Sequence, residues 1–149
     1  MIASHIGTNP RKRGSPHDRR RDGRSTGSAR YPLIEQIRCG GAGLGGFLTP
    51  TGVGTIVEDG KQTMTLEGKT WLLERPLRAD LALIRAHRAD MLGNLTYQLS
   101  ARNFNPLIAL AADITLVEPD EMVETGELQP DQIVTPGAVI DHIVIPQES

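Results

Sequence analysis

The chain is poor in aromatic residues and in cysteine, and each shortage excludes a class of protein. One Trp, two Tyr and two Phe among 149 residues leave a core that must be built from aliphatic side chains. The single cysteine, Cys39, cannot form an internal disulfide and has no second Cys or His at zinc-ligand spacing. These facts exclude a disulfide-rich secreted scaffold and a zinc module. We interpret Cys39 as a packing residue in a reducing compartment.

Long apolar runs are also missing. No stretch approaches the roughly 20 residues that a membrane-spanning helix needs. The first residues lack the charged start, the apolar middle and the cleavage site of a secretory signal. The sequence therefore predicts a cytoplasmic protein without membrane association, and 149 residues are enough for one domain.

Charge is unevenly distributed along the chain. Residues 1–30 hold eight of the sixteen Lys and Arg but only two of the eighteen acidic residues. Residues 11–32 (RKRGSPHDRRRDGRSTGSARYP) contain almost no apolar side chain that could offset the entropy of ordering. We therefore predict that residues 1–32 form a disordered basic segment. A basic arm that binds nucleic acid is an alternative, but an aromatic platform for base stacking is nearly absent.

The next part of the chain has the pattern of a short helix followed by a hairpin. Apolar residues recur at helical spacing over 33–37, and Gly40 and Gly41 then predict the end of a helix. Three runs predict strands: residues 55–58, 63–67 and 70–73. The sequence from Glu67 to Lys69 predicts the turn of a β-hairpin between the last two of these strands.

The second half predicts a parallel sheet. Residues 81–86 and 114–117 are short apolar runs bounded by charge, as expected of strands buried on both faces. Between them we predict a helix over 106–112 with Asn105 as its N-cap, and residues 143–145 read as a last strand. A strand, a helix and a strand form a crossover unit. The predicted fold class is therefore α/β: a partial, open and mostly parallel sheet with helices on its faces, plus a β-hairpin.

A glycine-rich loop, residues 39–55 (CGGAGLGGFLTPTGVGT), is the most distinctive feature. So many glycines let main-chain amides approach a ligand, although a tightly packed connection is the alternative. Residues 41–46 match the dinucleotide-binding pattern, but no strand precedes them and no long helix can follow, so we reject a nicotinamide site. The hydroxyls of Thr49, Thr51 and Thr55 could hold a carbonyl or a phosphate without a charged side chain.

Other polar residues carry weaker signals. The planar amide of Asn103 suits hydrogen bonding to an amide or a carboxylate, whereas the place of Asn105 before Pro106 is explained by a helix cap. His87 has no second metal ligand at helical or hairpin spacing and is interpreted as structural. The acids between residues 118 and 127 lack the pattern of a calcium loop, so no metal is implied.

Three separated segments resemble the alpha subunit of the bacterial acetate/acetoacetate (3-oxoacid) CoA-transferase family. They occur in the same order as in that family: residues 49–55 (TPTGVGT), 78–90 (RADLALIRAHRAD) and 101–106 (ARNFNP). The resemblance covers residue 33 to about residue 143. It implies an open CoA-transferase-like α/β fold, with residues 33–149 as the carboxy-terminal part of an alpha-subunit domain that is truncated at its amino-terminus.

The resemblance also implies the chemistry and the partners. A beta-subunit glutamate in a Ser-Glu-Asn-Gly motif forms the covalent CoA thioester in the family, and this chain has no such motif. We therefore expect no catalytic nucleophile here, no activity of the chain alone, no permanently bound cofactor, and a coenzyme A thioester and a short-chain carboxylate as substrates. The expected partner is a beta subunit in a heterotetramer. The candidate substrate or interface residues are Thr49, Thr51, Gly52, Gly54, Thr55 and Asn103.

The basic segment interrupts this resemblance. Residues 2–10 (IASHIGTNP) look like family sequence, as does the chain from residue 33, whereas the arginine-rich stretch between them does not. A shift of reading frame across that stretch is one interpretation. A second hypothesis for the chain as a whole is a non-catalytic, truncated remnant with uncovered sheet edges.

Overall fold

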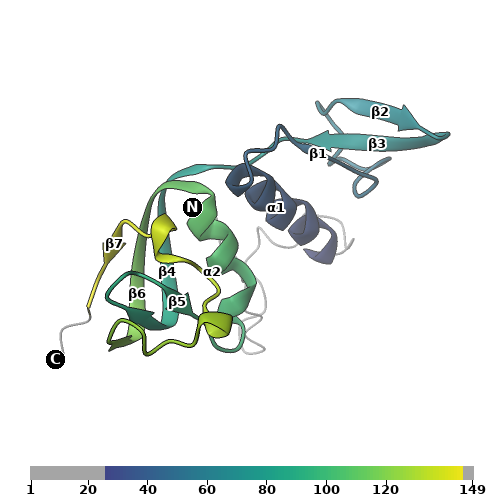
Figure 1. Ribbon diagram of the computed structural model, residues 1–149. Coiled ribbons are helices and arrows are strands. Elements are labelled where there is room, and N and C mark those ends of the chain that lie inside the picture. The colour runs from purple at the N-terminus through teal and green to yellow at the C-terminus, as the bar shows by residue number, and fades with distance from the viewer. Residues whose placement is uncertain (1–25, 146–149) are drawn as a thin grey trace, which may run out of the picture.

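The computed structural model describes residues 26–145, which form two β-sheets and two α-helices (Figure 1). Residues 75–78 connect the two sheets. The α-helices and strands, in chain order, are α1 Thr26–Gly41, β1 Phe47–Thr49, β2 Thr63–Leu66, β3 Lys69–Glu74, β4 Ala79–Asp90, β5 Leu95–Thr96, α2 Ala101–Leu110, β6 Ala112–Val123 and β7 His142–Ile143. Two 3-10 turns, η2 Pro130–Gln132 and η3 Gly137–Val139, precede β7. The small sheet lies at one end, the large sheet with α2 at the other, and α1 lies between them (Figure 1).

Helix α1 confirms the predicted helix but begins earlier, at Thr26. Pro32, which the sequence placed at the end of the basic segment, is buried inside this helix. Residues 26–32 therefore belong to the first helix. The remainder of the basic segment lies outside the described residues, so its disorder, its shifted reading frame and its binding of nucleic acid stay predictions.

Two glycines at the end of α1 are required by close packing. A Cβ atom on Gly40 would lie 2.0 Å from the carbonyl oxygen of Leu77, and one on Gly41 would lie 2.7 Å from Cβ of Leu110. Gly43 then reverses the chain with a φ of 68°, the left-handed conformation typical after a helix end. Part of the glycine-rich stretch therefore serves contact with α2 and with the segment before β4, rather than contact with a ligand.

The small sheet contains the predicted hairpin. Strands β2 and β3 pair antiparallel, with Leu66 opposite Lys69. The two residues between them, Glu67 and Gly68, have φ values of 51° and 74°, which is the geometry of a two-residue hairpin turn. The β-hairpin is confirmed.

The strand predicted at residues 55–58 is wrong. These residues lie in a series of turns in which the Thr55 amide donates to the Gly52 carbonyl and the Glu58 amide donates to the Thr55 carbonyl. The third strand is β1, which pairs antiparallel with β3 and gives the strand order β1-β3-β2. The β-branched residues at 55–57 suggested a strand. Gly52 just before them has a φ of 96°, which favours a turn instead.

The large sheet confirms the predicted parallel crossover. Its strand order is β5-β4-β6-β7, in which β4, β6 and β7 run parallel and β5 is antiparallel at the edge. Alternate residues of β4 are buried beneath α2, notably Ala82, Ile84 and Ala86. The intervening Leu81 and Leu83 are 50% and 68% exposed, so the opposite face of this sheet is open among the described residues. The prediction that these strands are buried on both faces is therefore wrong.

The helix between the parallel strands begins five residues before its predicted start. It begins at Ala101, so Asn105 and Pro106 lie inside it, and Asn105 is not its N-cap. The Asn105 side-chain amide donates to the Ala101 carbonyl (2.9 Å), and its side-chain oxygen accepts from the Arg85 amide of β4 (3.3 Å). Asn105 therefore ties α2 to the sheet, a long-range contact that sequence spacing does not reveal.

Candidate functional site

A pocket of about 420 Å³ lies where α1 meets the end of β1. Its lining comes from α1, β1, the loop after β1 and β3, and is made of Glu35, Arg38, Phe47, Leu48, Thr49, Pro50, Thr51 and Trp71. The ring and aliphatic side chains give it apolar walls, while the threonines and the charged pair of α1 supply polar groups. A pocket of this size and mixed character is in the range of small-molecule sites.

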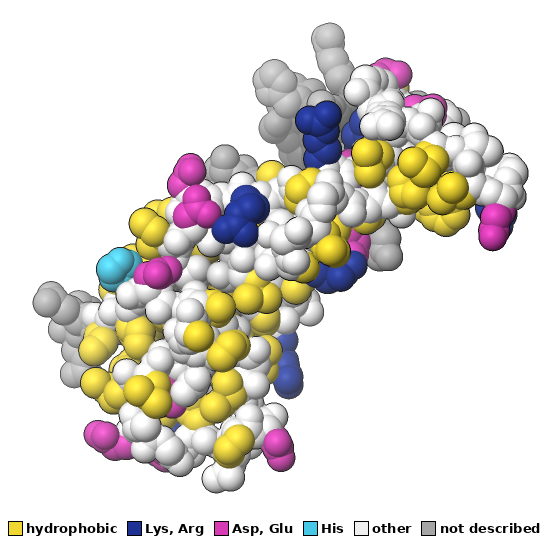
Figure 2. Space-filling view, turned by 45° about the horizontal axis from the view of Figure 1, so that its top comes forward, with side chains coloured by type: hydrophobic (Ala, Val, Ile, Leu, Met, Phe, Trp, Pro, Cys, Tyr) yellow, Lys and Arg dark blue, Asp and Glu magenta, His cyan; other side chains and the backbone are white. Residues whose placement is uncertain are grey.

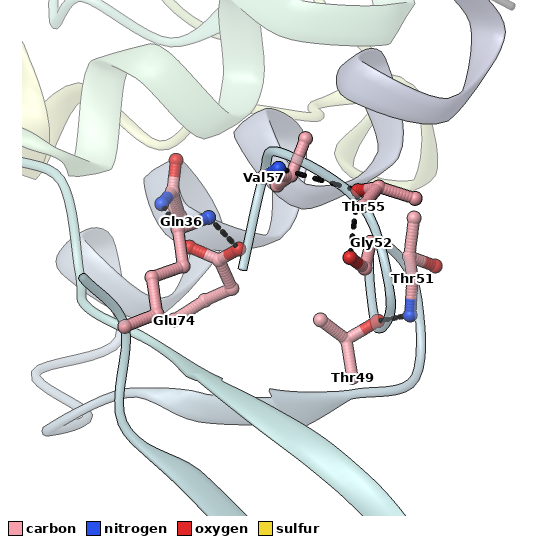
Figure 3. Close-up of polar contacts among 8 residues, drawn as sticks. Gln36, Thr49, Thr51, Gly52, Thr55, Val57 and Glu74 are labelled. Carbon is pink, nitrogen blue, oxygen red and sulfur yellow. Dashed lines mark hydrogen bonds and ion pairs between the residues drawn. The ribbon is translucent and has the colours of Figure 1, made fainter. Parts of the chain in front are cut away.

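The loop after β1 is held in shape by its own threonines (Figure 3). The buried hydroxyl of Thr49 accepts a hydrogen bond from the Thr51 amide (3.1 Å). The Thr55 hydroxyl donates to the Gly52 carbonyl (2.7 Å) and accepts from the Val57 amide (3.2 Å). Two of the three predicted ligand hydroxyls are therefore engaged inside the loop. Their direct effect is to fix the path of its backbone.

The predicted site residues fall into three groups. Thr49 and Thr51 line the pocket. Gly52, Gly54 and Thr55 form the turns beyond it and do not line the pocket. Asn103 is an exposed residue near the start of α2 and also lies outside the pocket lining. The structure thus brings together the first part of the threonine loop and separates Asn103 from it.

A buried carboxylate anchors this region, and the sequence analysis missed it. Glu74 at the end of β3 is only 2% exposed. Its carboxylate accepts a hydrogen bond from Gln36 of α1 (2.8 Å) and forms an ion pair with Lys61 (2.5 Å), which follows the loop (Figure 3 shows the Gln36 contact). One side chain therefore joins α1, β3 and the end of the threonine loop.

Three further lining residues, Glu35, Arg38 and Trp71, were not identified from the sequence. Arg38 donates through Nε and Nη2 to the Glu35 carboxylate, at 2.7 and 2.5 Å. The spacing of these two residues, three apart near the end of a helix, was a usable signal. The indole Nε1 of Trp71 is buried and has no hydrogen-bond acceptor in the described part of the chain. That property depends on tertiary packing and has no sequence signal.

A second polar cluster lies near the carboxyl ends of β4 and β6. Arg85 donates to the Asp120 carboxylate (2.8 Å), and Nδ1 of His87 lies 3.6 Å from its other oxygen. The hydrogen bond from Arg85 is the main cause that holds the pKa of Asp120 below its ordinary value. Burial opposes it, and the charge of Arg85 and the contact with His87 lower the pKa further. Arg88 pairs with Glu121 and Glu127. The Arg85–Asp120 and Arg88–Glu121 pairs join the neighbouring strands β4 and β6, while Glu127 lies beyond β6. Except for Arg88 and His87, these side chains are exposed, as expected of a solvated sheet surface.

Membrane spans and metal clusters are both missing from residues 26–145. No helix there has the length and apolar character needed to cross a membrane. No cluster of three His, Cys, Asp or Glu side chains there could hold a metal ion.

Comparisons with known proteins agree on one family. A family model described as Coenzyme A transferase matches residues 1–145. The alpha subunit of the acetate CoA-transferase of Escherichia coli strain K12 is 78% identical over 152 positions, which cover 100% of this chain and 67% of that protein. Both matches extend through the basic segment, beyond the region that the motifs covered.

More distant relatives support the same grouping. One subunit of the probable succinyl-CoA:3-ketoacid coenzyme A transferase of Bacillus subtilis strain 168 is 50% identical over 113 residues, 76% of this chain and 48% of that protein. The chain therefore spans about two thirds of one relative and about half of the other. The crystal structure of an acyl-CoA transferase from Escherichia coli O157:H7, a thioester complex with CoA, has a TM-score of 0.69 at 24% identity over 78% of this chain and 27% of its own, which shows a shared fold.

Proposed function

The chain belongs to the coenzyme A transferase family, and on that premise we propose that it acts as the alpha subunit of a heteromeric CoA-transferase. The reaction moves CoA between a short-chain acyl-CoA and acetate or acetoacetate. The observation that carries the proposal is the 78% identity to an acetate CoA-transferase alpha subunit over the full length of this chain. Relatives described as acting on 3-ketoacids support acetoacetate as the second acceptor.

The proposed chemistry uses a glutamate of a beta subunit. Its carboxylate attacks the acyl-CoA carbonyl and displaces CoA thiolate, which then attacks the glutamyl carbonyl of the resulting anhydride and releases the donor carboxylate. The acceptor carboxylate attacks the enzyme thioester, and the released thiolate takes the new acyl group and frees the glutamate. The nucleophile is assigned to the partner because this chain has no Ser-Glu-Asn-Gly motif.

This chain's proposed role is to position substrate at the boundary between the two proteins. Thr49 and Thr51 line the pocket, and the turns at Gly52, Gly54 and Thr55 give the loop a fixed path. A preorganised backbone can place N–H groups where negative charge develops on a carbonyl oxygen without reorganising during the reaction. Asn103 is a further contact in this proposal, from α2 and outside the pocket.

The proposal places the complex, a heterotetramer, in the cytoplasm. The free and fully buried Cys39 is consistent with a reducing compartment. Coenzyme A thioesters enter and leave as substrates, and no resident cofactor is part of the proposal.

Co-expression tests the proposal directly. The full chain is produced with and without the beta subunit of an acetate CoA-transferase, and transfer from acetoacetyl-CoA to acetate is followed by acetyl-CoA formation. We expect co-purification and transfer only with both chains, and a reduced rate for Gly52→Val, because a β-branched residue disfavours the positive φ of that turn. Turnover by this chain alone, or failure of the two chains to associate, contradicts the proposal.

A further inference from the structure

The segment between the loop after β1 and strand β2 contains a chemically labile peptide bond. Asp59 is followed directly by Gly60. An Asp-Gly bond readily forms a cyclic succinimide, because glycine has no Cβ to shield the amide that closes the ring. The other Asp-Gly pair of the sequence, Asp22-Gly23, lies outside the described residues. No Asn precedes a Gly in the sequence, so deamidation at such a pair does not compete.

Both residues of the labile bond are accessible. Asp59 and Gly60 are exposed, and a Cβ atom placed on Gly60 would meet nothing within 4 Å. Within residues 26–145, the Asp59 carboxylate has no hydrogen-bond or ion-pair partner, and the Gly60 amide donates to no acceptor. Ring closure at this bond therefore displaces neither a partner of the carboxyl group nor a packed side chain.

Other aspartates of the fold show how a carboxylate is kept from reacting. Asp90 is buried, and its carboxylate accepts hydrogen bonds from the Asn94 amide and side chain, both at 2.9 Å. The Asp141 carboxylate accepts from the Thr115 amide (2.7 Å). A carboxylate held in this way cannot turn toward the amide that follows it. Asp59 has no such restraint in the described part of the chain.

The turn that contains Asp59 is held by one main-chain hydrogen bond. The Lys61 amide donates to the Glu58 carbonyl (2.9 Å), and Gly60, the third residue of the turn, has a φ of 76°. A positive φ at the third residue alone is typical of a type II turn, in which glycine is preferred. Ring closure requires rotation about the Asp59 Cα–C bond, and an exposed turn with a single hydrogen bond permits that rotation.

We propose that Asp59-Gly60 is a site of spontaneous isomerisation to isoaspartate, with water as the only co-reactant. The Gly60 nitrogen attacks the side-chain carbonyl carbon of the protonated Asp59 carboxyl group. A C–N bond forms, and the carboxyl hydroxyl leaves with the amide proton as one water. Water then adds to either carbonyl carbon of the succinimide. Addition at the side-chain carbon breaks the new C–N bond and restores aspartate, whereas addition at the main-chain carbon breaks the original peptide bond and leaves isoaspartate.

The product lengthens the main chain by one methylene group between two anchoring residues. Oε2 of Glu58 accepts from the Gly54 amide (2.5 Å), and Lys61 forms the ion pair with the buried carboxylate of Glu74 (2.5 Å). An extra main-chain atom between Glu58 and Lys61 shifts these two contacts relative to each other. Isomerisation therefore loosens the hold of Glu74 on this segment. This inference does not rest on the proposed function.

Peptide mapping of the aged full chain tests the reaction. The chain is incubated at physiological temperature in near-neutral buffer and digested with trypsin, which releases residues 39–61 with Asp59 as their only aspartate. Electron-transfer fragmentation distinguishes isoaspartate from aspartate, and the succinimide is lighter by the mass of one water. We expect isoaspartate to accumulate in this fragment. Fragment 79–85, in which the exposed Asp80 precedes Leu81 on strand β4, is the internal control and should not change.

Two variants and a free peptide complete this test. Asp59→Glu should block the reaction, because a glutamate must close a larger ring. Gly60→Asn keeps a residue that tolerates a positive φ but places a side chain beside the amide, so isoaspartate should accumulate several-fold more slowly. A synthetic peptide of residues 54–64 gives the rate without the fold. A folded chain that stays unmodified while the peptide converts, or equal conversion at Asp80, overturns the proposal.

Thermal unfolding before and after incubation tests the structural consequence. We expect the melting temperature to fall in proportion to the isoaspartate found at Asp59. Asp59→Glu keeps Asp22-Gly23 and should not lose stability over the same time. Lys61→Met, which already lacks the ion pair, should lose less than the unmodified chain. An equal loss in Asp59→Glu, or no loss in a largely converted chain, overturns the link between this modification and the contact with Glu74.

Discussion

Glu74 is the residue on which the geometry of the candidate site most depends. Its buried carboxylate is balanced by one ion pair with Lys61 and one hydrogen bond from Gln36. Removing one partner of a buried pair leaves an uncompensated charge, which is more costly than losing an exposed pair. Because Lys61 is itself 30% exposed, water moderates that cost.

We predict that Lys61→Met lowers the free energy of unfolding by roughly 2 kcal/mol. In a Glu74→Gln background, Lys61→Met should lower the free energy of unfolding by less than half as much, because no buried carboxylate is left without its ion-pair partner. Urea unfolding of the four members of this cycle measures the coupling. Lys69→Met, at the exposed start of β3, is the matched control and should change little. Equal costs in the two backgrounds would contradict the anchoring role.

Asp90 makes the stability of the large sheet depend on pH. Burial raises the pKa of Asp90, but hydrogen bonds from the Asn94 side chain and from the amides of Asn94, Leu92 and Gly93 outweigh it and lower the pKa below 3.8. A folded-state pKa below the unfolded value means that the carboxylate stabilises the fold above about pH 4. That contribution is lost as the pH falls through the folded-state pKa.

We therefore expect Asp90→Asn to be less stable than the unmodified chain at neutral pH, with a difference that shrinks below about pH 4. Thermal unfolding measured from neutral to acid pH checks this expectation. Asp80→Asn, an exposed acid at the start of the same strand, controls for the loss of one negative charge. A difference that stays constant through the acid range would show that the hydrogen bonds to Asp90 do not favour its ionised form.

The residues that sequence reasoning found and missed differ in a physical way. Thr49 and Thr51 were recognised because a loop with many glycines and threonines is unusual by composition alone. Trp71, Glu74 and Arg38 became site residues only through packing of α1 against the small sheet. A buried indole without an acceptor and a buried carboxylate with two donors are tertiary properties, so no spacing along the chain could identify them.

Among the elements, those fixed by local chemistry were predicted and those fixed by contacts were not. The hairpin was predictable because Glu67 and Gly68 form a two-residue turn. The start of α2 was not, because the contact between Asn105 and β4 gives that residue a role that its position before a proline does not suggest. Strand β1 was hidden within the glycine-rich loop, since three residues are too few to show a period.

The turn between β2 and β3 predicts how substitutions at its two residues change stability. Glu67 has a φ of 51°, which is unfavourable for a residue with a long side chain, whereas Asn is preferred at the first position of such a turn. Glu67→Asn should raise the free energy of unfolding by about 0.5–1 kcal/mol without changing the urea m-value. Gly68→Ala should have the opposite sign, because it places a Cβ at a φ of 74°. Destabilisation by Glu67→Asn would contradict this assignment of the turn.

The whole molecule is asymmetric about its large sheet. Helix α2 covers one face, while the other presents Leu81, Leu83 and Ile114, with exposed fractions of 50%, 68% and 46%. Figure 2 shows hydrophobic side chains scattered between charged ones over the surface turned toward the viewer. On the open face, however, Leu81 lies opposite Ile114 in the parallel pair, so exposed apolar side chains are neighbours there. Neighbouring exposed apolar side chains promote association and bind hydrophobic dyes.

Adjacent residues of β4 therefore predict opposite outcomes for the same substitution. Leu83→Lys places a charge on the open face and should reduce dye binding and self-association of the full chain, with a small effect on thermal stability. Ile84→Lys places the same charge beneath α2, where the residue is 4% exposed, and should unfold the domain. Dye fluorescence, light scattering and thermal unfolding of the two variants check this pair. If both variants unfold, the face of the sheet that carries Leu83 is covered in solution. The alternation of buried and exposed residues along β4 would then not separate a core face from an accessible face.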